Sequence, residues 1–181
     1  MKPSNLFFLI GMMGSGKTTV GRALATRLGL EFVDADEQVV SRSGVPIATI
    51  FDIEGEAGFR RRERLVLEEL ARRERTVVAT GGGAVLDPGN RQLIREAGTV
   101  IYLRVSLDHL CRRTARDTSR PLLAKARDRR ATLESLLCAR DPLYREAAHF
   151  VVEGGAGSAA DLGERLAAML ATPAQPLEQR A

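Results

Sequence analysis

Eight residues near the N-terminus have the types and spacing of a phosphate-binding loop. Residues 11–18, Gly-Met-Met-Gly-Ser-Gly-Lys-Thr, fit the pattern G-x-x-x-x-G-K-[ST] and follow the apolar run 6–10. In such a loop backbone N–H groups turn towards a phosphate, the lysine reaches the β- and γ-phosphate oxygens, and the threonine hydroxyl ligates Mg²⁺. The helix that should follow adds the positive end of its dipole. The pattern therefore predicts nucleoside triphosphate binding, and the alternative is an ordinary glycine-rich turn between a strand and a helix.

A pair of carboxylates, Asp34 and Asp36, follows the short strand pattern 31–34. Transfer of a phosphoryl group needs Mg²⁺, cations on the migrating group and a carboxylate near the attacking hydroxyl. With one residue between them, one aspartate can face the metal and the other an acceptor. The alternative interpretation is that the pair only caps the helix that follows.

Alternating strand and helix patterns are expected to position these groups. We predict strands at 6–10, 31–34, 76–79, 99–103 and 149–152. Helices are predicted from the loop to 28, then at 36–43, 46–55, 56–73, 88–97, 106–116, 130–139 with a second piece after 142, and 158–171. Strands that alternate with helices imply right-handed crossovers and a mostly parallel sheet, with the ligand site at the carboxyl ends of the strands. In the helix 56–73 the side chains expected to be buried are Phe59, Leu65, Val66 and Leu70.

Length and composition predict one α/β domain over residues 1–171, with the tail 172–181 expected to be disordered. No apolar run approaches the roughly 18 residues of a membrane span, and the short apolar start leads directly into the phosphate loop. We therefore expect neither a membrane anchor nor a signal peptide, and a cytoplasmic location. Cys111 and Cys138 lack metal-ligand spacing and are expected to be small buried or half-buried residues.

The charge balance selects no partner by itself. Of the 27 basic residues 24 are arginines, which fits recognition of anions or, for most of them, a codon bias. The sequence has no basic tail, zinc-finger spacing or aromatic-rich sheet pattern, so no nucleic-acid partner is expected.

Taken together, several motifs over about residues 6–170 resemble the shikimate kinase family. They are residues 11–25, Asp34-Ala-Asp36, Ile50-Phe51, Gly55-Glu56, Phe59-Arg60-Arg61 with Glu63, Gly81-Gly82-Gly83-Ala84, Arg120-Pro-Leu-Leu123 and Arg140-Asp-Pro-Leu-Tyr144. The resemblance implies a P-loop fold of the nucleoside-monophosphate-kinase type, a three-layer sandwich with a five-stranded parallel sheet flanked by helices and a mobile lid at about 117–130. It also implies transfer of the γ-phosphate of ATP to the 3-hydroxyl of shikimate, with ATP as co-substrate and Mg²⁺ as cofactor, in aromatic amino-acid biosynthesis.

The resemblance assigns the acceptor and metal sites residue by residue. Asp36 would orient or deprotonate the acceptor hydroxyl, and Asp34 would hold Mg²⁺ through water beside Thr18. The remaining acceptor residues would be two arginines for the carboxylate, three glycines that offer backbone to the ring hydroxyls, and two aromatic walls: Arg60, Arg140, Gly81, Gly82, Gly83, Phe51 and Phe59. Glu63, one helical turn after Arg60, would fix the direction of that guanidinium.

For ATP, the resemblance assigns the loop residues Gly14, Ser15, Gly16, Lys17, Thr18 and Thr19. Lys17 and Arg120 would also be catalytic, with Arg120 swinging over the phosphates from the lid. Arg113 matches the family position that stacks on adenine. The loop 153–157, Glu-Gly-Gly-Ala-Gly, departs from the more polar stretch typical of the family.

Two other functions remain as alternatives. One is a kinase of similar fold acting on gluconate or a nucleotide. The other is a non-catalytic domain that senses shikimate-like acids, although no output module is recognisable before residue 6. The expected partners are shikimate and ATP, and a monomer is expected because the fold needs no partner to complete its site.

Overall fold

The computed structural model describes residues 5–115, 123, 126–155 and 157–171. Five strands alternate with helices in the predicted order. The elements are β1 (Leu6–Ile10), α1 (Lys17–Leu28), β2 (Glu31–Asp34), α2 (Ala35–Ser43), α3 (Ile47–Leu70), β3 (Thr76–Ala79), the 3₁₀ turn η1 (Ala84–Leu86), α4 (Pro88–Ala97), β4 (Thr99–Arg104), α5 (Leu107–Thr114), α7 (Arg129–Ala147), β5 (Phe150–Glu153) and α8 (Ala159–Ala171). Within these residues no helix is both long and apolar enough to cross a membrane.

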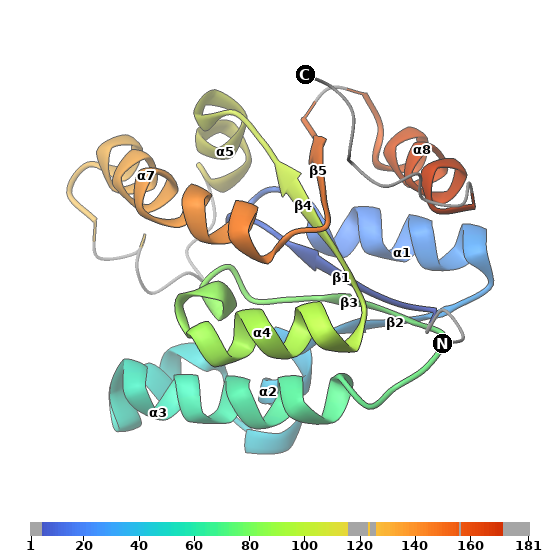
Figure 1. The fold of residues 1–181 in the computed structure, drawn as a ribbon. Coiled ribbons are helices and arrows are strands. Elements are labelled where there is room, and N and C mark those ends of the chain that lie inside the picture. The colour runs from blue at the N-terminus through green and yellow to red at the C-terminus, as the bar shows by residue number, and fades with distance from the viewer. Residues whose placement is uncertain (1–4, 116–122, 124–125, 156, 172–181) are drawn as a thin grey trace.

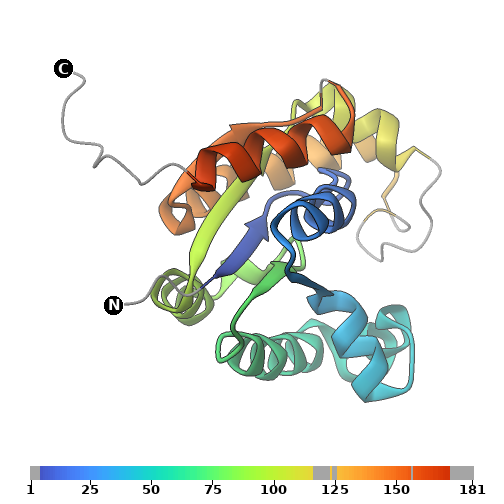
Figure 2. The ribbon, with the colours of Figure 1, turned by 90° about the vertical axis from the view of Figure 1, so that its right-hand side faces the viewer.

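The strands form one parallel sheet in the order β2-β3-β1-β4-β5. Helices cover both faces, with α1 and α8 on one side and α3, α4 and α7 on the other (Figures 1 and 2). The protein has two hydrophobic cores, one on each face of the sheet, and successive β1 side chains point into them alternately. Phe7 and Leu9 pack with residues of α1 and α8, while Phe8 and Ile10 pack with residues of α3 and α7. The predicted three-layer α/β fold with a five-stranded parallel sheet is confirmed.

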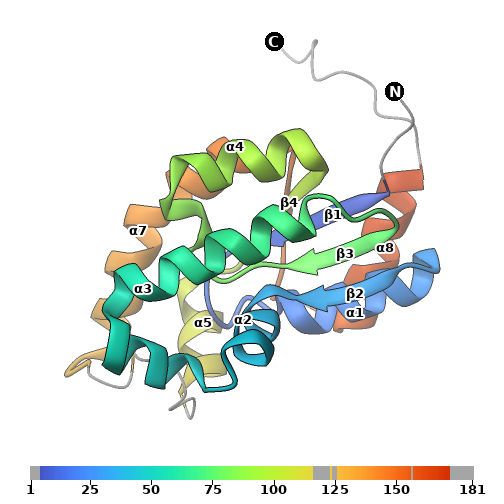
Figure 3. The same cartoon turned by 90° about the horizontal axis from the view of Figure 1, so that it is seen from below.

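The strand order brings the candidate site together at one edge of the sheet. β2, β3 and β1 are direct neighbours, with Asp34 paired with Ala79 and Leu9 paired with the same alanine on the other side (Figure 3). The segments that leave these three strands at their carboxyl ends are the phosphate loop 11–18, the aspartate pair and the three glycines 81–83. A parallel sheet therefore places side by side three segments that lie far apart in the sequence.

Helix α3 is divided at Gly55, where φ is 70° and ψ is −177°, and the two predicted helices meet at this bend. The second part ends at Leu70 instead of the predicted residue 73. The prediction that Leu65 is buried is wrong: its exposed fraction is 61%, whereas that of Leu67 is 0%. The buried face of α3 includes the charged Glu63, one turn before Leu67. Leu65 lies between these two residues in the sequence and therefore on the opposite face of the helix, towards solvent.

Four further predictions are corrected in the second half of the chain. The segments predicted as two helices around Pro142 form the single helix α7, although proline cannot donate the usual backbone hydrogen bond inside a helix. Helix α5 ends at Thr114 and the last strand begins at Phe150, each within two residues of the prediction. Cys111 is half-buried as expected, but Cys138 is exposed.

Most of the lid predicted at 117–130 lies outside the described residues, as do Arg120 and the tail 172–181. Leu123 is described, and its exposed fraction is 1%. It packs in the hydrophobic core on the α7 side of the sheet.

Candidate active site

The phosphate loop is shaped by its glycines. Gly11, Gly14 and Gly16 all have positive φ angles, of 145°, 78° and 93°, in the region that side chains rarely adopt. Gly16 is also the N-cap of α1, so no side chain caps the first N–H groups of this helix. Uncapped N–H groups and the positive end of a helix dipole form an anion site, as the sequence predicts.

Lys17 and Thr18, the first two residues of α1, place an ammonium group and a hydroxyl group beside this loop. The Lys17 ammonium donates to the carbonyls of Gly11 and Met12, both at 2.9 Å, so the side chain folds back along the loop. The Thr18 hydroxyl donates to Oδ2 of Asp34 at 2.7 Å. A hydroxyl and a carboxylate in contact beside a phosphate loop are the hard oxygen donors that suit Mg²⁺.

Asp34 also caps the next helix, which was the alternative interpretation of the aspartate pair. Its Oδ1 accepts from the backbone N–H groups of Asp36 and Glu37 at 3.0 and 3.4 Å, and the following α2 begins at Ala35. Because the two oxygens of Asp34 have different partners, capping and contact with Thr18 occur together. The cap fixes the start of α2 and with it the position of Asp36.

Asp36 lies against the first glycine of the triple-glycine segment. A Cβ atom on Gly81 would be 2.7 Å from Oδ1 of Asp36 and 2.5 Å from Oε1 of Glu63. A Cβ on Gly83 would overlap the Arg60 guanidinium, and one on Gly82 would be 3.3 Å from the backbone nitrogen of Met13. A larger residue at any of the three positions would press against a charged side chain or the phosphate loop, so glycine fits the space available there.

Arg60 and Glu63 form the central ion pair of the site. Arg60 Nη1 donates to Glu63 Oε2 at 2.6 Å, and Nη2 donates to Glu56 at 3.0 Å. Glu63 is 1% exposed, and burial raises its pKa above the usual range while the Arg60 charge opposes that shift. Burial lowers the pKa of Arg60, but Glu63 and Glu56 outweigh it and raise the pKa overall. The prediction that Glu63 directs this guanidinium is confirmed.

Arg140 brings a second guanidinium to the same place from α7. Its exposed fraction is 4%, and its Nη1 donates to the carbonyl of Gly82 at 3.3 Å. The aromatic rings of Phe51 and Phe59 lie with their centroids 5.0 Å apart on the two sides of the α3 bend. The two arginines and the two rings therefore converge from helices that are distant in sequence.

A cavity of about 790 Å³ joins these groups. Its lining includes these residues expected from the sequence: Gly14, Gly16, Lys17, Thr18, Thr19, Asp34, Asp36, Phe51, Phe59, Arg60, Gly81, Gly82, Gly83, Arg113 and Arg140. Ser15 lines a neighbouring cavity of about 260 Å³, which Gly155 and Gly157 also line. Arg113 borders both cavities and donates to the carbonyl of Ser15 at 3.1 Å.

Several lining residues were not assigned to the site from the sequence. Val40, Pro46, Ile47 and Ala48 form one wall from α2 and the start of α3. In the sequence such residues are indistinguishable from ordinary core residues of amphipathic helices. Met13 and Thr80 also line the cavity; they follow β1 and β3, and that position at the carboxyl end of a strand was the available signal.

The chain is similar to known proteins in sequence and in fold. The family model for shikimate kinase matches residues 13–171. A shikimate kinase of Bordetella avium is 57% identical over 149 residues, which cover 82% of this chain and 71% of that protein. The structure of a shikimate kinase from Acinetobacter baumannii in complex with shikimate is similar with a TM-score of 0.89 at 44% identity, covering 92% of both chains.

A more distant match concerns the alternative of a gluconate kinase. A gluconokinase from Sinorhizobium meliloti has a TM-score of 0.52 at 20% identity, covering 94% of this chain and 98% of that one. This is a likeness of fold alone. By the family model that matches most of its length and by its similarity to these relatives in sequence and fold, the chain belongs to the shikimate kinase family.

Proposed function

We propose that the protein transfers the γ-phosphoryl group of ATP to the 3-hydroxyl of shikimate, giving shikimate 3-phosphate and ADP. The observation that carries this proposal is the single cavity that joins the phosphate loop to a carboxylate, Asp36, and to two arginines, Arg60 and Arg140. A phosphate loop alone fits many nucleotide-binding proteins. The added pair of guanidiniums selects an acceptor that carries a carboxylate.

On the acceptor side, Arg60 and Arg140 would bind the carboxylate of shikimate. Arg60 is held by Glu63 and Glu56, so little conformational freedom is left to lose on binding. The backbone of Gly81, Gly82 and Gly83 would meet the ring hydroxyls, and Phe51 and Phe59 would cover the apolar side of the ring. These contacts would hold the 3-hydroxyl at Asp36, which would orient it and accept its proton.

On the donor side, residues 14–19 would cradle the phosphates of ATP through backbone N–H groups. Lys17 would move its ammonium from the loop carbonyls to the phosphate oxygens and neutralise the charge that spreads over the transferred group. Thr18 and, through water, Asp34 would hold Mg²⁺, which would neutralise negative charge on the phosphates. Arg113 would stack on adenine. From the family resemblance, Arg120 in a lid at about 117–130 would close over the phosphates.

One chain carries every residue assigned to the site, which supports a monomer as the active form. Three predictions from the sequence remain predictions: that residues 1–171 form a single domain, that the tail 172–181 is disordered, and that the protein is cytoplasmic.

The proposed reaction is tested by measuring ADP release from purified protein with ATP and Mg²⁺. Shikimate, gluconate and nucleoside monophosphates are compared with a sample that has no acceptor. We expect strong stimulation by shikimate alone. Stimulation by gluconate or a nucleotide would instead favour a related kinase, and shikimate binding without turnover would favour a sensor.

A further inference from the structure

Tyr144 on α7 is a buried side chain for which the proposed reaction has so far no role. Its exposed fraction is 0%, and its hydroxyl donates to the carbonyl of Gly82 at 2.5 Å. The Sδ atom of Met12, in the phosphate loop, lies 3.7 Å from the same hydroxyl. Tyr144 therefore contacts the triple-glycine segment on the acceptor side and the phosphate loop on the donor side.

The carbonyl of Gly82 is shared with the acceptor machinery. It accepts both from Tyr144 and from Arg140, which lies one turn earlier on the same helix face. The peptide bond is planar and trans, so a carbonyl fixed towards α7 also fixes the N–H group of Gly83 in the opposite direction. Burial raises the pKa of Tyr144 to about 12, so the hydroxyl keeps its proton and remains a donor at neutral pH.

We propose that Tyr144 is a positioning residue for the phosphoryl acceptor. Its hydroxyl holds the Gly82 carbonyl, and through this carbonyl it sets the direction of the Gly82–Gly83 peptide and of the Arg140 guanidinium. Tyr144 acts through these groups and is not itself in contact with the acceptor, since it is absent from the lining of the cavity. The inference rests on the proposed function and adds a residue to it.

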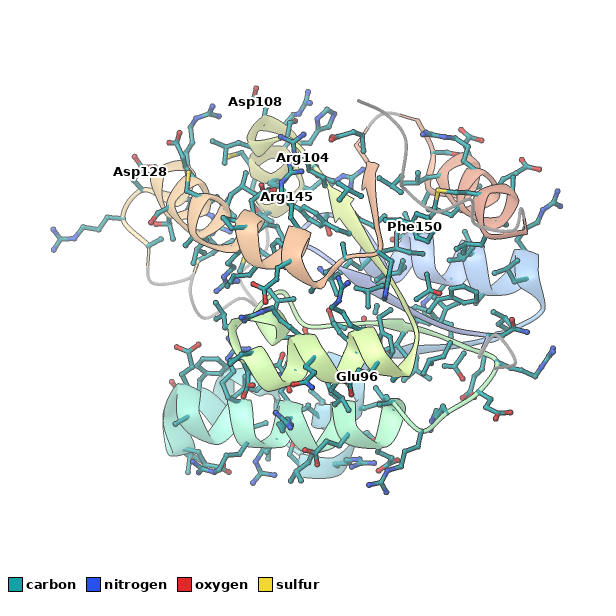
Figure 4. The ribbon with its side chains drawn as sticks, in the orientation of Figure 1. Glu96, Arg104, Asp108, Asp128, Arg145 and Phe150 are labelled. Atoms are coloured by element: carbon teal, nitrogen blue, oxygen red, sulfur yellow. The ribbon has the colours of Figure 1, made fainter. Side chains whose placement is uncertain are left out.

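Tyr102 on β4 offers a matched control within the same aromatic stack. The two rings are stacked with centroids 4.9 Å apart and an interplanar angle of 26°. The Tyr102 hydroxyl donates at 2.8 Å to Asp141, a carboxylate that also contacts Arg145 and Arg104. Figure 4 labels these two arginines. Both tyrosines therefore bear a hydrogen-bonded hydroxyl on a buried ring, but only that of Tyr144 is bonded to the acceptor segment.

The test compares Tyr144→Phe with Tyr102→Phe, which keep both rings and remove one hydroxyl each. We measure kcat, KM for shikimate, KM for ATP and the thermal unfolding midpoint. Tyr144→Phe should raise KM for shikimate about tenfold, the size expected when a buried carbonyl loses the shorter of its two hydrogen bonds, and leave KM for ATP within about twofold. Tyr102→Phe should leave both KM values within about twofold, although both variants lose stability.

The wild-type protein is assayed first, so that two kinds of failure can be told apart. A wild type whose ADP release is not stimulated by shikimate would overturn the proposed function, and with it the acceptor role of Tyr144. With an active wild type, equal KM values for shikimate in the two variants would assign Tyr144 to stability alone and overturn only this inference. A parallel rise of KM for ATP in Tyr144→Phe would overturn it too. Titration calorimetry with shikimate should reproduce the difference between the variants without turnover.

Discussion

The donor and acceptor halves of the cavity are built in different ways. The donor half is built around one continuous segment, residues 11–18, in which three glycines with positive φ shape the backbone and the helix start supplies the N–H groups. The acceptor half depends on side chains from α2, α3 and α7 that meet over the three glycines after β3. A site made of backbone is encoded by local spacing, whereas a site made of converging side chains is encoded only by the fold.

This contrast has a consequence for mutation. A single substitution in the acceptor half removes one side chain and leaves the phosphate loop intact, so acceptor and donor parameters should separate. If the affinity for ATP stays constant in such variants, the two halves work independently; a fall in that affinity would show that they are coupled.

The largest effect is expected for Asp36→Asn. The amide keeps the size of the side chain but cannot accept a proton as the carboxylate does, so kcat should fall by roughly 10²–10⁴-fold. The dissociation constant for ATP should stay within about twofold, because Asp36 belongs to the acceptor half. Steady-state kinetics and calorimetry with ATP check the two values. An unchanged kcat would remove Asp36 from the acceptor hydroxyl.

The next effect is expected for Gly81→Ala. Its new Cβ would lie 2.5 Å from Glu63 and 2.7 Å from Asp36, so at least one carboxylate must move. A displacement of this kind should lower kcat for shikimate about 100-fold.

Gly29→Ala serves as the control for Gly81→Ala. Gly29 has φ of +64° and no atom within 4 Å of a new Cβ, so it should lose about 1 kcal/mol of stability through strain and keep its activity. Equal activity of the two variants would show that the space at Gly81 is not needed.

Arg140→Ala should act on acceptor binding. It removes a buried guanidinium that lines the cavity, and KM for shikimate should rise about 10- to 100-fold while kcat changes less. Arg145→Ala removes an exposed arginine from the next turn of α7, where it pairs with Asp141, and should leave KM unchanged. If Arg140→Ala altered the affinity for ATP alone, this arginine would belong to the donor half.

The smallest effect concerns the pH dependence of stability at Glu63. Its folded pKa is raised by burial, so this group contributes stability below the unfolded value of 4.5 and loses it as pH rises through the raised pKa. Chemical denaturation of the wild type and of Glu63→Gln should therefore diverge above pH 4.5, with the free energy of unfolding of the variant improving relative to the wild type.

A second glutamate on α3 gives the opposite sign. Arg62 lowers the pKa of Glu54 through a side-chain hydrogen bond, so Glu54 contributes stability above pH 4.5 that is lost as pH falls through the lowered pKa. The free energy of unfolding of Glu54→Gln should therefore fall furthest below that of the wild type above pH 4.5, and the difference should shrink as the pH is lowered. Parallel curves for both variants and the wild type would contradict the burial of the Glu63 charge.

The five strands and the donor half could be predicted from the sequence, because buried parallel strands are short apolar runs and the phosphate loop is contiguous. The failures have physical causes. Leu65 was expected in the core because apolar spacing cannot show that a charged residue, Glu63, occupies the buried stripe. Pro142 was expected to divide a helix that tertiary packing keeps whole.

For the aspartate pair, spacing alone left open whether Asp34 and Asp36 were ligands or caps; in the structure one oxygen of Asp34 caps α2 and the other accepts from Thr18. Arg60 and Arg140 were assigned through the family resemblance, since no local pattern relates residues 80 positions apart. The wall from Val40 to Ala48 was missed because a ligand-facing apolar side chain and a core side chain have the same pattern in a helix.

The stacked rings of Tyr102 and Tyr144 allow the acceptor site to be followed by fluorescence spectroscopy. The chain has no tryptophan and only these two tyrosines, so its tyrosine fluorescence arises from one pair of rings. One ring is hydrogen-bonded to the carbonyl of Gly82, directly behind the cavity. The protein thus carries a built-in optical probe at its acceptor segment, and an unlabelled sample is sufficient to follow changes there in real time.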